Sequence, residues 1–145
     1  MAKRPLKLSI RVPAYKRPRN DWRRLIHAEV IKSQRKSPVR YEVSDRLEVQ
    51  CRLYMNTWAL AHHDVDNRLK DILDALQGRA GGPKGKRTLA AIIPNDRQIY
   101  RVIVEKFPCQ ADSDGWGVVT IRRLPSANIR WRKARQLFAK ANACE

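Results

Sequence analysis

The chain has 145 residues and carries 31 lysines and arginines against 14 aspartates and glutamates, for a formal net charge of +17. This excess favours a polyanionic partner, namely nucleic acid, an anionic membrane surface or an acidic protein. No apolar run approaches the roughly 20 residues that span a bilayer, and the first residues lack the apolar core of a secretory signal, which argues against a membrane-spanning or secreted protein. The three cysteines, Cys51, Cys109 and Cys144, match no disulfide framework or zinc pattern, and we expect a cytoplasmic protein.

The first half of the chain predicts a strand, a helix and a second strand. Apolar residues alternate over 6–12, which is typical of a strand with one buried face. Residues 21–36 carry an apolar stripe and predict a helix, with Asn20 as a possible cap. Strict alternation over 46–55 gives the clearest strand pattern and places Cys51 on its apolar side.

The second half predicts a helix over about 66–77, which ends at Gly78, and then a Gly-rich basic loop over 78–94. Two further strands are expected, followed by a last helix, at 97–107, 116–124 and 128–143 respectively. The order of these elements predicts a single α/β (α+β mixed) domain with a mixed β-sheet and packed helices. The predicted core covers about residues 6–123, and the last helix is an extension.

Acidic residues gather at one point of this basic chain, in the stretch HHDVDNRLKDILDAL at 62–76. If 64–66 is extended, Asp64 and Asp66 project to one side, and Lys70 lies one helical turn beyond Asp66. Asp96 begins the next strand and would close on the pair if that strand lies beside the one that ends near residue 62. Carboxylates that repel one another are tolerated around a divalent cation, and oxygen ligands suit Mg²⁺ or Mn²⁺. The pattern therefore suggests a phosphodiesterase that acts on DNA or RNA, in which Lys70 stabilises charge on the phosphate.

A plainer interpretation of the same residues stays open at this point. Asp66 could simply cap the following helix, and Asp66–Lys70 and Lys70–Asp74 could be ordinary pairs one turn apart. Asp71 has the pattern of a surface residue. A D-x-D spacing alone is a weak signal, whereas the string D-x-D-N-x-x-K with a later N-D-x-Q at a strand start is more specific.

DVDNRLKDILDAL followed by NDRQIYRVIVEK resembles the RusA-like Holliday junction resolvases. The resemblance covers about residues 6–123 and rests on a family pattern of D-[LIV]-D-N-x-x-K, a helix ending in D-A-L, and D-x-Q-[VI] at a strand start. It departs from that pattern in the longer loop at 78–94, in His63 where a basic residue is common, and in the extension after residue 128.

The resemblance implies a homodimer of mixed α/β fold that nicks four-way DNA junctions symmetrically with Mg²⁺ or Mn²⁺. By position, Asp64, Asp66 and Asp96 would be the metal ligands and Lys70 the catalytic lysine, with Asn67 in support. Such an enzyme would act in DNA recombination and repair, in a bacterial or phage context.

Further residues are candidates for contacts with the DNA backbone. They lie before the first motif aspartate, after the first strand and in the basic loop: His63, Arg17, Arg19, Lys84, Lys86 and Arg87. The second strand or the third could supply a dimer interface. Two rival functions remain, a non-catalytic basic DNA-binding module and a nuclease of forks, flaps or RNA, because phosphate contacts do not read sequence.

Overall fold

The computed structural model describes residues 6–83 and 86–125. The predicted mixed α/β fold is confirmed, with a four-stranded mixed sheet and three helices in the described part of the chain. The elements are β1 (Lys7–Pro13), α1 (Arg19–Lys36), β2 (Leu47–Met55), α2 (Thr57–His62), α3 (Val65–Leu76), the 3₁₀ turn η1 (Asp96–Gln98), β3 (Ile99–Pro108) and β4 (Gly115–Arg123). The helix expected at 128–143 lies outside the described residues.

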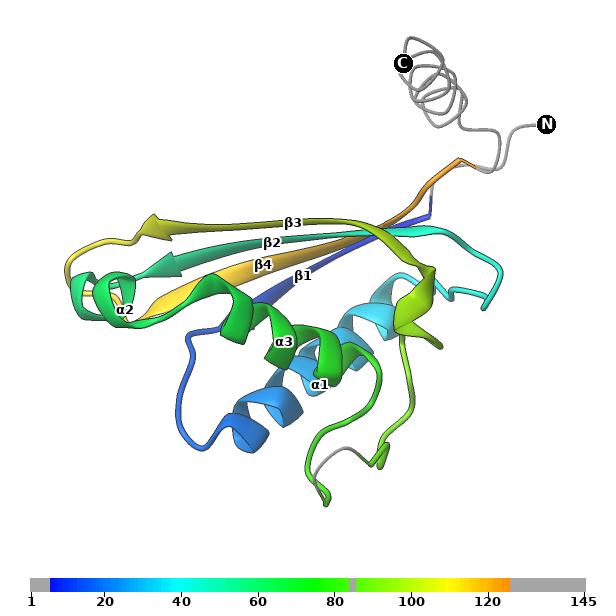
Figure 1. The fold of residues 1–145 in the computed structure, drawn as a ribbon, viewed down its shortest axis with the longest axis horizontal. Helices are drawn as coiled ribbons and strands as arrows, with labels where there is room; N and C mark the ends of the chain where they lie inside the picture. Colours follow the sequence, from blue (N-terminus) through cyan, green and yellow to red (C-terminus); the bar gives the residue numbers. More distant parts are fainter. Residues whose placement is uncertain (1–5, 84–85, 126–145) are drawn as a thin grey trace, which may run out of the picture.

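The strands lie in the order β1-β4-β2-β3 (Figure 1). β4 runs antiparallel to both β1 and β2, whereas β2 and β3 run parallel. A parallel pair needs a crossover connection, and α2, α3 and the following loop provide it. Among the described strands, β2 is interior and β3 is an edge.

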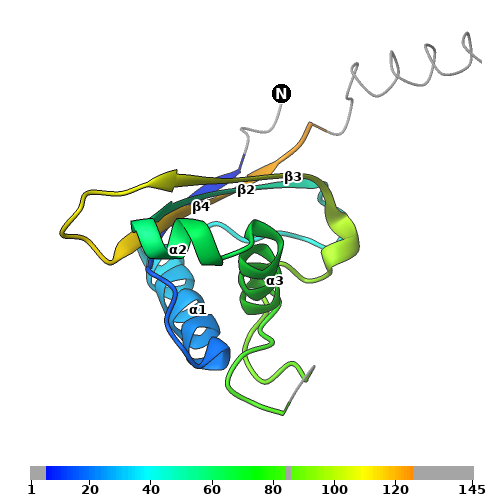
Figure 2. The same cartoon turned by 60° about the vertical axis from the view of Figure 1, so that its left-hand side comes forward.

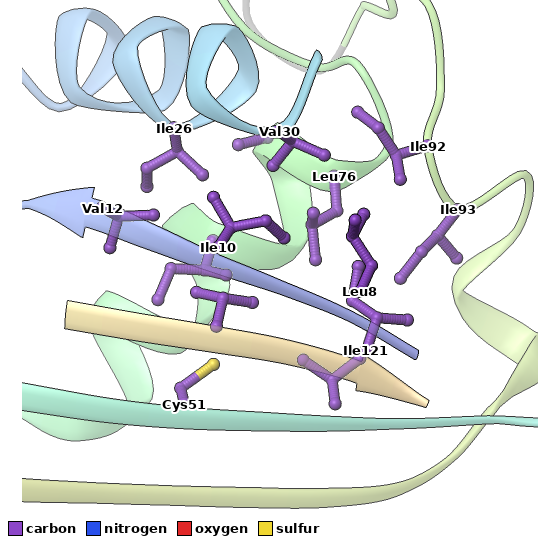
Figure 3. Close-up of a cluster of buried hydrophobic side chains, with 14 of the residues drawn as sticks. Leu8, Ile10, Val12, Ile26, Val30, Cys51, Leu76, Ile92, Ile93 and Ile121 are labelled. Atoms are coloured by element: carbon purple, nitrogen blue, oxygen red, sulfur yellow. The ribbon is translucent and has the colours of Figure 1, made fainter. Parts of the chain in front are cut away.

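Helices α1 and α3 pack side by side on one face of the sheet (Figure 2). The alternation seen in the sequence explains this layer, because every second side chain of each strand points toward the helices. Leu47, Val49 and Cys51 of β2 are fully buried there, and Ile10, Ile26 and Leu76 join them from β1, α1 and α3 (Figure 3). Cys51 has no exposed surface, which confirms it as a core residue, and this burial raises the pKa of its thiol to about 12.

The loop after α3 begins at the predicted glycine and returns to the core before η1. Gly78 has a φ of +77°, and a side chain there would collide with the Leu89 carbonyl, so the expected glycine stop is confirmed. The residues that follow the Gly-rich stretch at 78–88 are fixed to the core. The amides of Ile92 and Ile93 donate to the Leu76 carbonyl at 2.8 and 3.0 Å, and both side chains are buried in the core.

Candidate active site

The acidic motif lies where the chain leaves β2 and returns as α3. α2 occupies Thr57–His62, and the Asn56 side chain caps it by accepting from the Ala59 amide at 2.9 Å. Asp64 is the extended N-cap residue of α3 and the helix begins at Val65, so the condition that all of 64–66 is extended is not met. Asp64 and Asp66 instead lie at the N-terminal end of one helix, where negative charge is favourable.

Four polar residues of the motif are open to solvent. Asp64, Asp66, Asn67 and Lys70 are all exposed. An aspartate with a purely capping role would instead accept a hydrogen bond from a backbone amide in the first turn of the helix. The capping alternative fails in its simplest form, because the N-cap is Asp64 rather than Asp66 and the Asp64 side chain makes no capping hydrogen bond. Two exposed carboxylates two residues apart at a helix end fit Mg²⁺, which keeps several waters and is usually bound by one or two carboxylates.

Lys106 fixes this end of the crossover to the sheet. Its Nζ donates to the carbonyls of Leu60 and His63, at 2.7 and 3.0 Å. Lys106 lies near the end of β3, beside Leu53 of β2. The acidic pair is thereby held at the end of the sheet where both parallel strands finish.

Asp96 lies at the other end of β3. It begins η1, where Asn95 and Gln98 form a capping box and the Gln98 amide donates to the carbonyls of Glu42 and Asp45. Ile99 pairs with Leu47 at the start of β2. The seven steps from Ile99 to Lys106 span about 23 Å at about 3.3 Å per residue.

The expectation that Asp96 closes on the pair within one chain is therefore wrong. β2 and β3 do pair, but they run parallel, so the start of one lies far from the end of the other. In agreement, no group of three or more His, Cys, Asp or Glu side chains within residues 6–83 and 86–125 could hold a metal ion. The metal-binding roles of Asp64, Asp66 and Asp96 stay predictions.

A hollow of about 210 Å³ opens beside the acidic pair, between the β1–α1 connector, α2 and the start of α3. Its walls are mostly apolar and aromatic, and include Tyr15, Trp22 and Trp58. Lys16, Arg17, His63 and Arg68 add basic groups to its lining. Asp64 and Asp66 thus adjoin a recess in which Lys16, Arg17 and Arg68 outnumber the one lining carboxylate, Asp114.

His63 lines the hollow and directly precedes Asp64 in the sequence. Its ring meets those of Tyr15 and Trp58 edge to face, at centroid distances of 5.1 and 5.6 Å. Burial lowers the pKa of His63, and the positive charge of Arg68 lowers it further. A neutral His63 at neutral pH can accept or donate a hydrogen bond, but it adds little to the attraction of phosphate.

An ion cluster next to the hollow was missed by the sequence analysis. Asp71 was expected at the surface, yet it is fully buried and bound by three arginines. Arg23 and Arg19 lie 2.9 and 3.0 Å from its carboxylate, and Arg68 lies 3.6 Å away. Arg68 also stacks on Tyr15, with its guanidinium carbon 3.5 Å from the ring centroid. This cluster ties α3 to α1 and so sets the position of the acidic motif.

The predicted DNA-contact residues fall in different places. Arg17 is exposed on the rim of the hollow, whereas Arg19 is partly committed to Asp71. Lys86 and Arg87 are exposed in the loop after α3, where Arg87 donates to the Pro94 carbonyl at 3.0 Å. Lys84 lies outside the described residues. The contacts of these side chains with DNA stay predictions.

Comparison with known proteins adds no family to this description. No family model matches the chain, and no curated protein matches it. No helix among the described residues is both long and apolar enough to cross a membrane.

Proposed function

We propose that this protein is a metal-dependent endodeoxyribonuclease that resolves four-way DNA junctions by paired, symmetric nicks. The observation that carries the proposal is the exposed pair Asp64 and Asp66 beside a recess lined by Arg17 and Arg68, in a chain of formal charge +17. The basic surface would hold the phosphate backbone, and the acidic pair would hold the cation that assists its hydrolysis. The resemblance to the RusA-like resolvases in the same residues supports this choice of substrate. Junction resolution would place the protein in DNA recombination and repair, in the cytoplasm of a bacterium or in a phage-infected cell.

Asp64, Asp66 and Asp96 would bind Mg²⁺, with Mn²⁺ as a substitute. The ion would supply an activated water and neutralise charge on the phosphate. Lys70 is exposed one turn beyond Asp66, where its ammonium group can neutralise a phosphate oxygen of the bound strand. Asn67 would hold a carboxylate of the pair in position.

A second copy of the chain would bring Asp96 to the acidic pair. Tyr100 and Val102 of the edge strand β3 are 49% and 41% exposed, so β3 offers both unpaired backbone and apolar side chains. A twofold axis through the middle of β3 would pair it antiparallel with its copy, and the start of one strand would then lie beside the end of the other. Asp96 of the partner subunit would approach Asp64 and Asp66, and the dimer would carry two such sites. β2 is interior, which favours β3 over β2 as the interface.

Mixing two inactive variants tests this shared site. Asp66→Asn and Asp96→Asn should each abolish junction cleavage alone. After the two are unfolded and refolded together, about half of the dimers should be heterodimers with one complete site, which restores about a quarter of the wild-type rate of single-strand nicking. Gel assays of a labelled four-way junction would measure it. A mixture as inactive as its components would mean that no site draws on two chains.

The function itself is tested by a panel of labelled DNA substrates. We expect Mg²⁺ or Mn²⁺ to support cleavage of a four-way junction in preference to a fork, a flap or a linear duplex, and a chelator to abolish it. A non-catalytic DNA-binding module would instead bind the junction equally well with chelator and leave every strand intact. Preferential cutting of forks, flaps or RNA would replace the junction as substrate.

A further inference from the structure

The hollow beside the acidic pair contains buried polar atoms that form no hydrogen bond within the described structure. In the described structure, Nε and Nη1 of Arg68 and Nδ1 of His63 are buried without a hydrogen-bond partner. The Arg68 side chain is only 9% exposed. A buried donor that bonds nothing costs free energy, and a ligand that offers acceptor atoms would recover it.

The charge around Arg68 is incompletely balanced. Its nearest carboxylate, Asp71, also binds Arg19 and Arg23, and Arg23 has the neighbouring Asp74 at 3.1 Å as a second partner. Three guanidinium groups therefore share two carboxylates. Electron-rich groups that enter the hollow would be attracted by the remaining positive charge.

The shape and lining of the hollow favour a planar group. Its volume is about 210 Å³, and aromatic rings from the β1–α1 connector, α1 and α2 face it. Trp58 lies on its rim with 58% of its surface exposed, which is unusual for so large an apolar side chain. The His62 ring stacks on one face of Trp58 at a centroid distance of 4.4 Å and an angle of 12°, which holds the indole in place and leaves its other face for a ligand.

The geometry points to a subsite for one unstacked nucleobase, stacked on Trp58 at the mouth of the hollow, with its acceptor atoms toward Arg68. The inference rests on the proposed function, because a strand cut at Asp64 and Asp66 would place the neighbouring base at this opening. Lys16 and Arg17 on the rim would contact the adjoining phosphate. Aromatic stacking with hydrogen bonds to the base edge is how proteins bind unstacked bases. The base in this subsite would set the preferred cleavage sequence.

Binding of deoxynucleoside 5′-monophosphates tests the subsite without metal or cleavage. The indole N–H signals of the protein are followed by NMR during titration with each of the four monophosphates at millimolar concentration, and the Trp58 signal is assigned from Trp58→Ala. We expect saturable shifts at Trp58 and Trp22 with at least one monophosphate, and no such shifts with deoxyribose 5-phosphate, which lacks the base. Trp58→Ala should weaken binding by about fivefold or more, because stacking of one base contributes about 1–3 kcal/mol. Val43→Ala, which removes an exposed apolar side chain outside the hollow, should not.

Two results would overturn the subsite. Equal shifts with deoxyribose 5-phosphate would mean a phosphate site only, and no saturable shift with any monophosphate would mean no base site. Either result leaves junction cleavage intact and so separates the failure of the subsite from the failure of the proposed function. A second readout uses junctions with a single abasic position beside the mapped nick. Wild-type cleavage should fall with the missing base, whereas Trp58→Ala should cut both junctions at similar rates.

Discussion

Replacement of Asp66 by asparagine is expected to slow junction cleavage by at least about 100-fold, the rate equivalent of the few kcal/mol that a bound cation contributes to stabilising the transition state. Asparagine keeps the size and one oxygen of the side chain but removes the negative charge that would hold the cation. Asp66 is exposed, so the fold should survive with a loss of at most about 1 kcal/mol from the first turn of α3. Single-turnover gel assays in Mg²⁺ would measure the rate.

Asp112→Asn is the matched control for this experiment. Asp112 is an exposed aspartate in the turn between β3 and β4, and the same chemical change there should leave cleavage at the wild-type rate. Circular dichroism would verify that both variants fold. If Asp66→Asn cut as fast as Asp112→Asn, the acidic pair would have no part in catalysis.

The second large effect concerns stability. Asp71→Ala should lower the free energy of unfolding by about 3–5 kcal/mol, because it leaves buried Arg68 and half-buried Arg23 without their shared carboxylate. Asp71 has no exposed surface, so water cannot replace the lost contacts. Urea unfolding followed by circular dichroism would give the two free energies.

Asp21→Ala provides the comparison on the surface. Asp21 pairs with Arg24 one turn away on α1, and the two side chains are 42% and 57% exposed. An exposed pair of this kind contributes about 1 kcal/mol or less. Similar losses in the two variants would show that the buried cluster does not hold α3 against α1.

The type of an element could be predicted from sequence where its apolar pattern extends over many residues. Alternation over 46–55 and the apolar stripe of 66–77 each extend over enough residues to fix the type of element, and both are confirmed. α2 was missed because six residues make less than two turns and show no period. Its one available signal was Asn56, a favourable N-cap residue.

The sequence predicted only the part of the site whose residues lie close to one another along the chain. The adjacency of Asp64 and Asp66 follows from their spacing, and the structure adds that both are exposed at a helix end. The position of Asp96 depends on the direction of β3 relative to β2, which alternation along a single strand does not encode. The burial of Asp71 depends on Arg19 and Arg23, which lie about 50 residues earlier in the chain.

The most direct test of the central claim is the binding of Mn²⁺ to the metal-free protein, measured by isothermal titration calorimetry. The claim is that Asp64 and Asp66 are the core of a divalent-cation site. It predicts saturable binding to the wild type and none to Asp64→Asn/Asp66→Asn, with Asp112→Asn unchanged. Binding of equal affinity and stoichiometry in the double variant would contradict it.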